Sequence, residues 1–351
     1  MKKYDAKKAE QKRKETEGQA RELISTILNE YHTDPTLLAE AFAFSSNFYQ
    51  YSAVNTQLIF SQNRGATYCQ SFNAWKKMGH SVLSGEKGLK IWVPIRTTLL
   101  EIEKGEFVKL SEATKEQREA YQNGVIKGYE KLSFGIGNVF DISQTTFPKE
   151  DYPKLFSMGY PSDQHLAICR GIEDFAAEQL HCPVLQSDLS SISRRGAYYP
   201  NQNIIKINNK LEDTQRLCTT IHELGHALIH SGSSAANKSV SQKEIEADAL
   251  SIIVQANYGI ELTEARKIHF KDHYDSYMSN IIGDGNRDYR TAVDDIFNSV
   301  FQVYKEHVDT INDYVSKRLA DTNIEKDTSI NHLSKPYSDK HSKSKNKLIE
   351  R

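Results

Sequence analysis

The sequence predicts an α+β protein of two domains, in which a small sheet packs on helices. The chain has 351 residues, of which 38% are hydrophobic and 10% aromatic, enough for two domains that each bury a core. Two stretches, at about 214–230 and 243–254, carry apolar residues at helical spacing. Short β-type runs bounded by Gly, Asn and Pro occur in both halves. Helices and short strands are therefore expected in the same chain.

The amino-terminal part predicts a polar arm followed by a capped helix. Residues 1–20 are almost entirely polar, and we expect them to form a solvated helix or a frayed arm. Asp34 and Pro35 give the start signal of the next helix, with Asp34 as the cap and Pro35 at the first helical position.

Two segments follow before the middle of the chain. Residues 81–84 and 89–93 flank Gly85-Glu86-Lys87-Gly88, and this arrangement predicts a β-hairpin. The stretch 101–131 is charged and has helical composition. We expect it to be an insertion with few apolar anchors.

The second half predicts a hairpin and then an amphipathic helix. Residues 196–200 and 204–207 flank an Asn-rich turn and are typical of two paired strands. The helix is expected at about 214–230, with Asp213 or Thr214 as its cap and Ser231-Gly232 as its stop signal.

Within that helix, residues 222–226 read His-Glu-Leu-Gly-His. Two histidines four apart project from one helix face, close enough for both imidazoles to reach one Zn²⁺. Glu223 then lies beside the metal, where it can take a proton from metal-bound water. The pattern predicts a hydrolytic zinc site with His222 and His226 as ligands and Glu223 as the catalytic base.

A third ligand is expected from the carboxylates of the next helix. Glu244 and Asp248 lie one turn apart on one face, so one can bind metal while the other accepts the second ring N–H of a ligand histidine. Glu246 is the fallback ligand. An alternative stays open, because Ser241 and Glu244 match a helix capping box that needs no metal.

The pair HELGH and E-x-E-A-D resembles the ligand helices of gluzincin-type metallopeptidases, and the layout is similar to compact peptidases related to ImmA and IrrE. The resemblance implies that Glu244 is the third ligand, and that Asp248, or Glu246, acts behind the ligands. A strand on the side of the 196–207 hairpin would hold a peptide substrate in extended form. His230 is expected to be a helix-end histidine. The candidates for a second electrophilic group are Tyr198, Tyr199, His269, His273 and Tyr274.

Aromatic and amide residues alternate with basic ones from Tyr49 to Pro94. Exposed aromatic side chains can stack on unpaired bases while cations contact phosphates, although most aromatic residues are buried in cores. The candidate contacts to single-stranded DNA are Tyr51, Asn55, Arg64, Phe72, Trp75, Lys76, Lys77, Lys87 and Lys90.

This segment also resembles the amino-terminal domain of ArdC antirestriction proteins. The resemblance runs from about 20 to 145 and depends on ordered anchors: the run 51–59, Gln62-Asn63, Ala66-Thr67, Phe72, Trp75, Gly79, 85–88 and the closing motif 139–145. ArdC proteins and the LtrC-like proteins of Gram-positive plasmids combine a domain that binds DNA, chiefly single strands, with a zincin domain. The resemblance implies action on conjugatively transferred DNA, in antirestriction or establishment.

The expected organisation follows from both resemblances. It comprises an arm at 1–20, an ArdC-like DNA-binding domain at 21–150, a zincin domain at 151–324 and a disordered tail at 325–351. Two other functions stay open. One is an ImmA-like regulatory protease that cleaves a repressor, and the other is a DNA-protecting protein with a structural zinc site.

The apolar runs, the charged start of the chain and the cysteines indicate the cellular compartment. No apolar run has the length of a membrane span, and the start of the chain is charged, unlike a signal peptide. The cysteines are scattered singly, which predicts reduced thiols in a cytoplasmic protein; they are Cys69, Cys169, Cys182 and Cys218.

Overall fold

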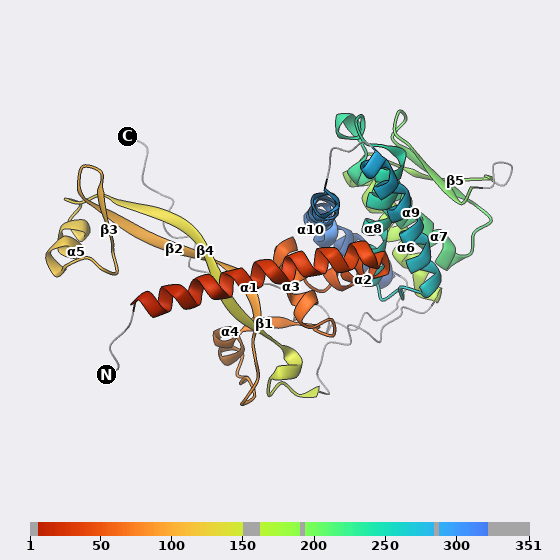
Figure 1. Ribbon diagram of the computed structural model, residues 1–351. Helices are drawn as coiled ribbons and strands as arrows, with labels where there is room; N and C mark the ends of the chain where they lie inside the picture. The colour runs from red at the N-terminus through yellow and green to blue at the C-terminus, as the bar shows by residue number, and fades with distance from the viewer. Residues whose placement is uncertain (1–5, 150–161, 190–193, 284–287, 322–351) are drawn as a thin grey trace. The chain divides into compact units, whose positions relative to one another are not determined.

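The computed structural model describes residues 6–149, 162–189, 194–283 and 288–321 (Figure 1). The chain divides by packing into two compact units. The first unit contains residues 1–27 and 57–146, and the second contains residues 28–56 and 147–351. The linear boundaries expected from the sequence, at 20, 150 and 324, stay a prediction, and the expected tail at 325–351 lies outside the described residues.

The helix α1, Ala6–Thr33, contains most of the polar segment that was expected to be an arm. Its amino-terminal part belongs to the first unit, where Gln19 accepts a hydrogen bond of 2.5 Å from Lys90 Nζ. The guanidinium of Arg21 lies 5.8 Å from the ring centroid of Trp92. The polar residues of α1 therefore contact the sheet of the first unit through specific side chains.

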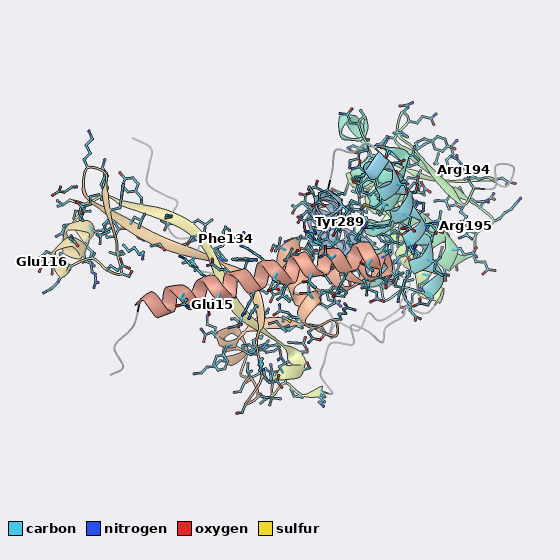
Figure 2. All side chains as sticks on the ribbon, in the orientation of Figure 1. Glu15, Glu116, Phe134, Arg194, Arg195 and Tyr289 are labelled. Atoms are coloured by element: carbon cyan, nitrogen blue, oxygen red, sulfur yellow. The ribbon has the colours of Figure 1, made fainter. Side chains whose placement is uncertain are left out.

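The first unit contains an antiparallel sheet of four strands in the order β1-β4-β2-β3. Its strands are β1 Cys69–Ser71, β2 Leu89–Glu103, β3 Glu106–Lys109 and β4 Gly128–Asp141. The long strands β2 and β4 pair from Leu89 with Val139 to Leu100 with Gly128, and form the extended ribbon in Figure 1. Phe134 on this ribbon is 58% exposed (Figure 2).

The hairpin predicted for 81–84 and 89–93 is wrong. Val82 makes only an isolated bridge with Thr145, while the strand from Leu89 pairs with β4. At Gly88 an added Cβ would lie 2.7 Å from Asn138 Cβ, so this glycine allows close packing against β4. Local sequence cannot distinguish this distant pairing from a hairpin, because both leave the same alternation on the strand.

The charged stretch 101–131 is not a helical insertion either. It contains the end of β2, the strand β3 and the start of β4, with one short helix, α5 Lys115–Gln122. Thr114 and Gln117 form a capping box at the start of α5. None of the residues of α5 is buried, so this short helix has no apolar core face.

Short elements close the first unit around a buried carboxylate. These elements are the helix α4 Phe72–Lys77, the 3-10 helix η1 Ile142–Gln144 and the part of the helix α3 (Ala53–Gln62) from Gln57 onward. Asp141 accepts backbone N–H groups from Thr67 at 2.7 Å and Tyr68 at 3.1 Å, and it also caps η1. The motif at 139–145 therefore joins the end of β4 to the segment before β1.

The second unit is mostly helical. Its helices are α2 Pro35–Ser45, α6 Ser162–Gln179, α7 Asp213–Ile229, α8 Val240–Asn257, α9 Glu264–Gly283 and α10 Tyr289–Asp321, with a 3-10 turn, η4 Gly232–Ala235. The predicted cap is confirmed, since Asp34 accepts from Thr36 N at 3.1 Å. The ring of Phe42 stacks on Phe297 with centroids 4.9 Å apart. At the start of α10, Tyr289 stacks on His32 at 4.1 Å (Figure 2).

A three-stranded sheet accompanies these helices in the order β5-β7-β6. Its strands are β5 Val184–Ser187, β6 Gly196–Tyr199 and β7 Ile204–Asn208. The predicted hairpin is confirmed as the antiparallel pair β6 and β7, and β5 is parallel to β7. Buried Ile205 and Ile207 pack with Ala227 of α7, so the small sheet covers one side of the helix that carries His-Glu-Leu-Gly-His.

Both units mix helices with a small sheet, and the predicted α+β class is confirmed. Among the residues that the structure describes, none of the helices combines the length and apolar character needed to cross a membrane.

Candidate metal centre

The metal ligands predicted from the sequence converge between α7 and α8. Nε2 of His222 lies 3.6 Å from Glu244 Oε2, and Nε2 of His226 lies 3.7 Å from the same oxygen. One ligand atom from each residue falls within 4.8 Å of the others. Two imidazoles and a carboxylate so arranged form a set of donors for a divalent cation.

Gly225 allows the two ligand helices to approach closely. An added Cβ at this position would lie 3.1 Å from the carbonyl oxygen and 3.2 Å from Cα of Ala247 on α8. Such contacts are shorter than the van der Waals optimum of about 3.5–4.0 Å. The glycine between the two histidines therefore sets how near Glu244 comes to them.

Glu223 lies beside this group and is buried, with 8% of its surface exposed. Burial raises the pKa of its carboxyl above the ordinary value. The imidazoles of His222 and His226 and a backbone hydrogen bond at Tyr198 act in the opposite direction. The close neighbour on the sheet side is Gly196, where an added Cβ would lie 3.1 Å from Glu223 Oε1.

Asp248 lies behind His222, where the sequence placed a carboxylate. Its Oδ1 is 3.5 Å from His222 Nδ1 and 2.5 Å from the Arg266 guanidinium, and the side chain is fully buried. Burial by itself would raise the pKa of Asp248, but hydrogen bonds with His222 and His269 and the charge of Arg266 hold it well below its usual range.

The pKa values of the ligand groups reflect the same contacts. Burial by itself would lower the pKa of His222, whereas hydrogen bonds with Asp248 and Glu244 raise it to about 9. Hydrogen bonds with both histidines hold the pKa of Glu244 far below normal. A cation that bound His222 would have to displace the proton that this raised pKa favours, so metal binding at this centre is expected to release protons.

Glu246 is not placed as a ligand, which corrects the fallback prediction. Its carboxylate accepts hydrogen bonds from Lys238 at 2.6 Å and Gln242 at 2.9 Å, and lies 2.9 Å from His230 Nε2. The Glu246 carboxylate is therefore hydrogen-bonded to these three residues and does not lie with Glu244 among the metal ligands. The physical reason is helix geometry, since residues two apart on a helix point about 200° apart.

The alternative that Glu244 belongs to a capping box is wrong. The cap of α8 is Ser239, whose hydroxyl accepts from Gln242 N at 3.1 Å, and Ser241 lies inside the helix. The predicted cap of α7 is also wrong: Glu212 precedes the helix without a side-chain cap bond. The hydroxyl of Thr214 contacts His165 Nδ1 at 2.8 Å instead.

Two family profiles match the chain in the order of its two parts. Residues 21–130 match the N-terminal domain of anti-restriction factor ArdC. Residues 177–277, which include α7 and α8, match the IrrE N-terminal-like domain, a peptidase family. The chain is an ArdC-like protein. It carries an ArdC amino-terminal domain followed by a peptidase-like domain.

Relatives of this ArdC-like chain were found by sequence and by structure. The uncharacterized protein pXO2-81 of Bacillus anthracis is 30% identical over 281 residues, which are 75% of this chain and 47% of the relative. The chain thus spans about half the length of that curated relative.

Crystal structures of the antirestriction protein ArdC from plasmid R388 are also similar. The metal-free structure aligns at 16% identity with a TM-score of 0.40, and covers 79% of this chain and 87% of that chain. The Mn(II)-bound structure aligns at 15% identity with a TM-score of 0.37, and covers 76% and 85%. The assignment depends on the two profiles, not on these alignments.

In the ArdC-type domain, Trp75 is not available for base stacking, which corrects the sequence prediction. The side chain is fully buried, and its indole N–H donates to the carbonyl of Phe140 at 2.9 Å. Phe72, by contrast, is 53% exposed on the same short helix α4. Lys76 and Lys77 are exposed at the end of α4.

The remaining predicted DNA contacts are divided between the two units. Arg64 and Lys87 are exposed in the first unit, and the partly buried Lys90 contacts Gln19. Tyr51 and Asn55 belong to the second unit. Asn55 is 9% exposed, and the Tyr51 carbonyl accepts from Lys305. Burial leaves Asn55 little surface for DNA, whereas the Lys305 contact engages only the backbone of Tyr51, whose side chain is half-buried.

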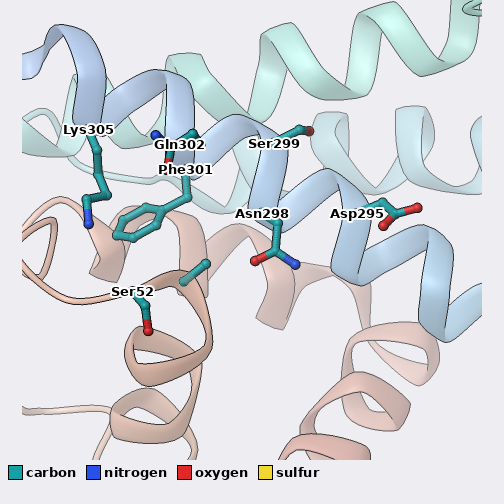
Figure 3. A pocket seen from close by; sticks show the side chains of 8 residues that line it. Ser52, Asp295, Asn298, Ser299, Phe301, Gln302 and Lys305 are labelled. Carbon is teal, nitrogen blue, oxygen red and sulfur yellow. The ribbon is translucent and has the colours of Figure 1, made fainter. Parts of the chain in front are cut away.

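Lys305 also lines an open pocket with Ser52, Asp295, Asn298 and Gln302 (Figure 3). The pocket lies between α10 and the start of α3 and contains none of the predicted metal ligands. Its lysine is already bound to the Tyr51 carbonyl at 2.7 Å. Nothing in this pocket contributes to the metal centre.

A second group of possible ligands combines one residue of α8 with two of α9. Asp248, His269 and His273 bring ligand atoms within 4.8 Å of one another. The Arg266 guanidinium, 2.5 Å from Asp248 Oδ1, already neutralises the carboxylate and would repel a second cation. The sequence analysis missed Arg266, although its spacing of three residues to His269 and seven to His273 places all three on one helix face.

The other candidates for a second electrophilic group are engaged elsewhere. The Tyr274 hydroxyl is buried and contacts His32 Nδ1 at 3.1 Å. Tyr198 donates to Asn203 at 3.1 Å, and the ring of Tyr199 lies 5.0 Å from Lys206 Nζ. Burial lowers the pKa of His273, and the charge of Asp248 acts in the opposite direction. For His273 the role of second electrophilic group stays a prediction.

Proposed function

We propose that this ArdC-like protein is a zinc metallopeptidase whose amino-terminal domain binds DNA, chiefly single strands. The observation that carries the proposal is the meeting of His222, His226 and Glu244. Ligands about 2.0–2.1 Å from a tetrahedral zinc ion lie about 3.3–3.4 Å apart, and two of the ligand pairs are already 3.6 and 3.7 Å apart. Two imidazoles and one carboxylate also match the donor set of catalytic zinc sites.

Zinc held by these residues would polarise a peptide carbonyl and make a water molecule more acidic. Glu223 would take the proton from that water and later give it to the leaving amine. Its burial favours this role, because a raised pKa brings the carboxyl nearer to neutral pH. The absence of a side chain at Gly196 leaves room for the Glu223 carboxyl beside the sheet.

The edge position of the strand β6 is an argument for a peptide substrate. In the described sheet, β6 pairs with β7 on one side and is at the edge of the order β5-β7-β6. An extended peptide can add to such an edge by backbone hydrogen bonds. Because Gly196 on β6 adjoins Glu223, a peptide at this edge would pass the catalytic carboxylate.

The metal and the catalytic base can be tested separately. Purified wild-type protein should contain one zinc per chain by elemental analysis, and Glu244→Gln should lose most of it. Glu223→Gln should keep the metal but lose cleavage in a proteome digest read by the appearance of new amino termini. Absence of stoichiometric zinc in the wild type, or undiminished cleavage by Glu223→Gln, would sink the proposal.

DNA binding is best supported at α4, where exposed Phe72 lies one helical turn before Lys76. A base can stack on the ring while the cation contacts a phosphate. Phe72→Ala and Lys76→Gln should each weaken binding of a fluorescent oligo(dT). Lys76→Gln should also reduce the slope of log affinity against log salt by about 0.7. Lys115→Gln on α5, a highly exposed lysine, is the matched control and should leave both quantities unchanged.

The biological role that we propose is antirestriction or establishment of DNA that enters a cell on a mobile element. The match to the ArdC amino-terminal domain supports this role. If the peptidase chemistry carries it, Glu223→Gln will not protect incoming DNA in a transformation assay against a restricting host. Full protection by Glu223→Gln would assign the role to DNA binding and leave the zinc site a structural one.

A further inference from the structure

A series of hydrogen-bonded side chains begins at Nδ1 of His226, the ring nitrogen that does not face Glu244. Nδ1 of His226 lies 3.0 Å from Nδ1 of His230, and Nε2 of His230 lies 2.9 Å from Glu246 Oε2. His230 is 4% exposed and Glu246 is 2% exposed. Buried groups of this kind need hydrogen-bond partners, and here each ring nitrogen of His230 has one.

The hydrogen-bond partners of Glu246 and His230 decide which ring nitrogens of His226 and His230 carry protons. Glu246 is held as an acceptor by Lys238 at 2.6 Å and Gln242 at 2.9 Å. A carboxylate has no proton to donate, so Nε2 of His230 must donate to it. In a neutral ring Nδ1 of His230 is then an acceptor, and the proton between the two histidines belongs to Nδ1 of His226.

This assignment is the one that a metal requires. Nε2 of His226 faces Glu244 at 3.7 Å, and a metal there needs the Nε2 lone pair, which leaves the ring proton on Nδ1. If Nδ1 of His230 carried the shared proton instead, the proton of a neutral His226 would lie on Nε2, where it blocks the metal.

We infer that His230 and Glu246 form a positioning relay that fixes the His226 proton on Nδ1 and so prepares Nε2 for the metal. This inference rests on the proposed zinc site. For His222 a carboxylate fixes the ring proton directly, because Asp248 Oδ1 lies 3.5 Å from Nδ1 of His222. The two ligand histidines of α7 are therefore oriented by different groups. His222 contacts a carboxylate, whereas His226 contacts a histidine that is itself hydrogen-bonded to a carboxylate.

The relay also explains why a histidine ends α7 at this position. His230 is the C-cap residue, and its backbone N–H donates to the His226 carbonyl at 2.8 Å. The same pair of residues is thus joined through both backbone and side chain. Removal of the imidazole leaves the backbone link, so the effect of the ring can be measured by itself.

The test uses two replacements of His230 with opposite expectations. His230→Leu keeps a comparable volume but removes both hydrogen bonds, and zinc affinity should fall about 10–100-fold, as for other partners that orient metal ligands. His230→Gln offers an amide oxygen to His226 and an amide N–H to Glu246, and should restore affinity to within about threefold of wild type. Affinity is measured by competition with a chromogenic chelator.

A matched variant and a second readout separate positioning from stability. Lys238→Met removes one partner of Glu246 but leaves the His230 contact, and should lower zinc affinity less than His230→Leu does. In the zinc-loaded wild type, long-range ¹H–¹⁵N spectra should show His226 protonated at Nδ1 and His230 at Nε2. Melting of the metal-free variants shows whether each one is folded.

Three outcomes would overturn the relay. They are wild-type affinity in His230→Leu, equal losses in the Leu and Gln variants, or a His230 proton on Nδ1 in the zinc form. The proposed function fails in a distinguishable way, because then the wild-type protein itself binds no stoichiometric zinc.

Discussion

Replacing Gly225 by alanine tests whether the approach of α7 to α8 sets the metal site. The new methyl group would lie 3.1 and 3.2 Å from the carbonyl oxygen and Cα of Ala247, about 0.3–0.9 Å inside the van der Waals optimum of about 3.5–4.0 Å. The neighbour is backbone, so α8 must move by a few tenths of an ångström. Glu244 lies one turn before Ala247 on α8 and moves with it.

The expected magnitudes separate stability from metal binding. Overpacking of a core contact costs about 1–3 kcal/mol, while alanine instead of glycine stabilises a helix by about 1 kcal/mol. The net destabilisation is then about 0–2 kcal/mol, or a melting temperature lower by about 2–4 °C for each kcal/mol. Zinc affinity should fall at least about tenfold, which is about 1.4 kcal/mol, because Glu244 leaves its position near both histidines.

Calorimetry of the metal-free protein and chelator competition for zinc measure the two effects. Gly171→Ala is the matched control, since its Cβ would lie 2.5 Å from Cα of Val315 where α6 packs on α10. That variant should melt lower than wild type and still bind zinc with wild-type affinity where it is folded. The reasoning is refuted if Gly225→Ala melts higher than wild type and binds zinc equally well.

Three further predictions follow from other contacts. Gly196→Ala would place a Cβ 3.0 Å from Glu223 Cγ, so peptide cleavage should drop while zinc content stays at wild-type level. Trp75→Ala should destabilise the first unit by about 3–5 kcal/mol in urea unfolding, because the indole is fully buried; a stability close to wild type would contradict its place in the core. Burial raises the pKa of Cys169 to about 12 and that of Cys182 to about 11. Both thiols should therefore react with a disulfide reagent near pH 8 only at the rate of unfolding, and fast labelling of the native protein would count against their burial.

Several features of the site were predictable because they are local. The spacing in His-Glu-Leu-Gly-His fixes two imidazoles on one face of a helix, and the structure places both beside Glu244. The capped helix at Asp34 and the hairpin of β6 and β7 are local in the same sense and are confirmed. In each case the deciding contacts lie within a few residues along the chain.

Other features depend on which surfaces meet. The aromatic segment contains both Phe72 and Trp75, and composition treats them alike, yet one is half exposed and the other is fully buried against β4. The strand that begins at Leu89 pairs with β4, from Leu89 with Val139 to Leu100 with Gly128, instead of with the segment just before it. Sequence patterns give the face of an element but not its partner.

Local spacing along the chain gives two imidazoles and a glutamate at the spacing of zincins, after an ArdC-like segment. Which carboxylate contacts which histidine depends on the packing of two helices. Glu244, Glu246 and Asp248 all lie on α8, and the rotation of that helix against α7 directs Glu244 to the ligand atoms, Asp248 to His222 and Glu246 to His230. That rotation is set by core packing and by the contact at Gly225, and packing between helices depends on both surfaces at once.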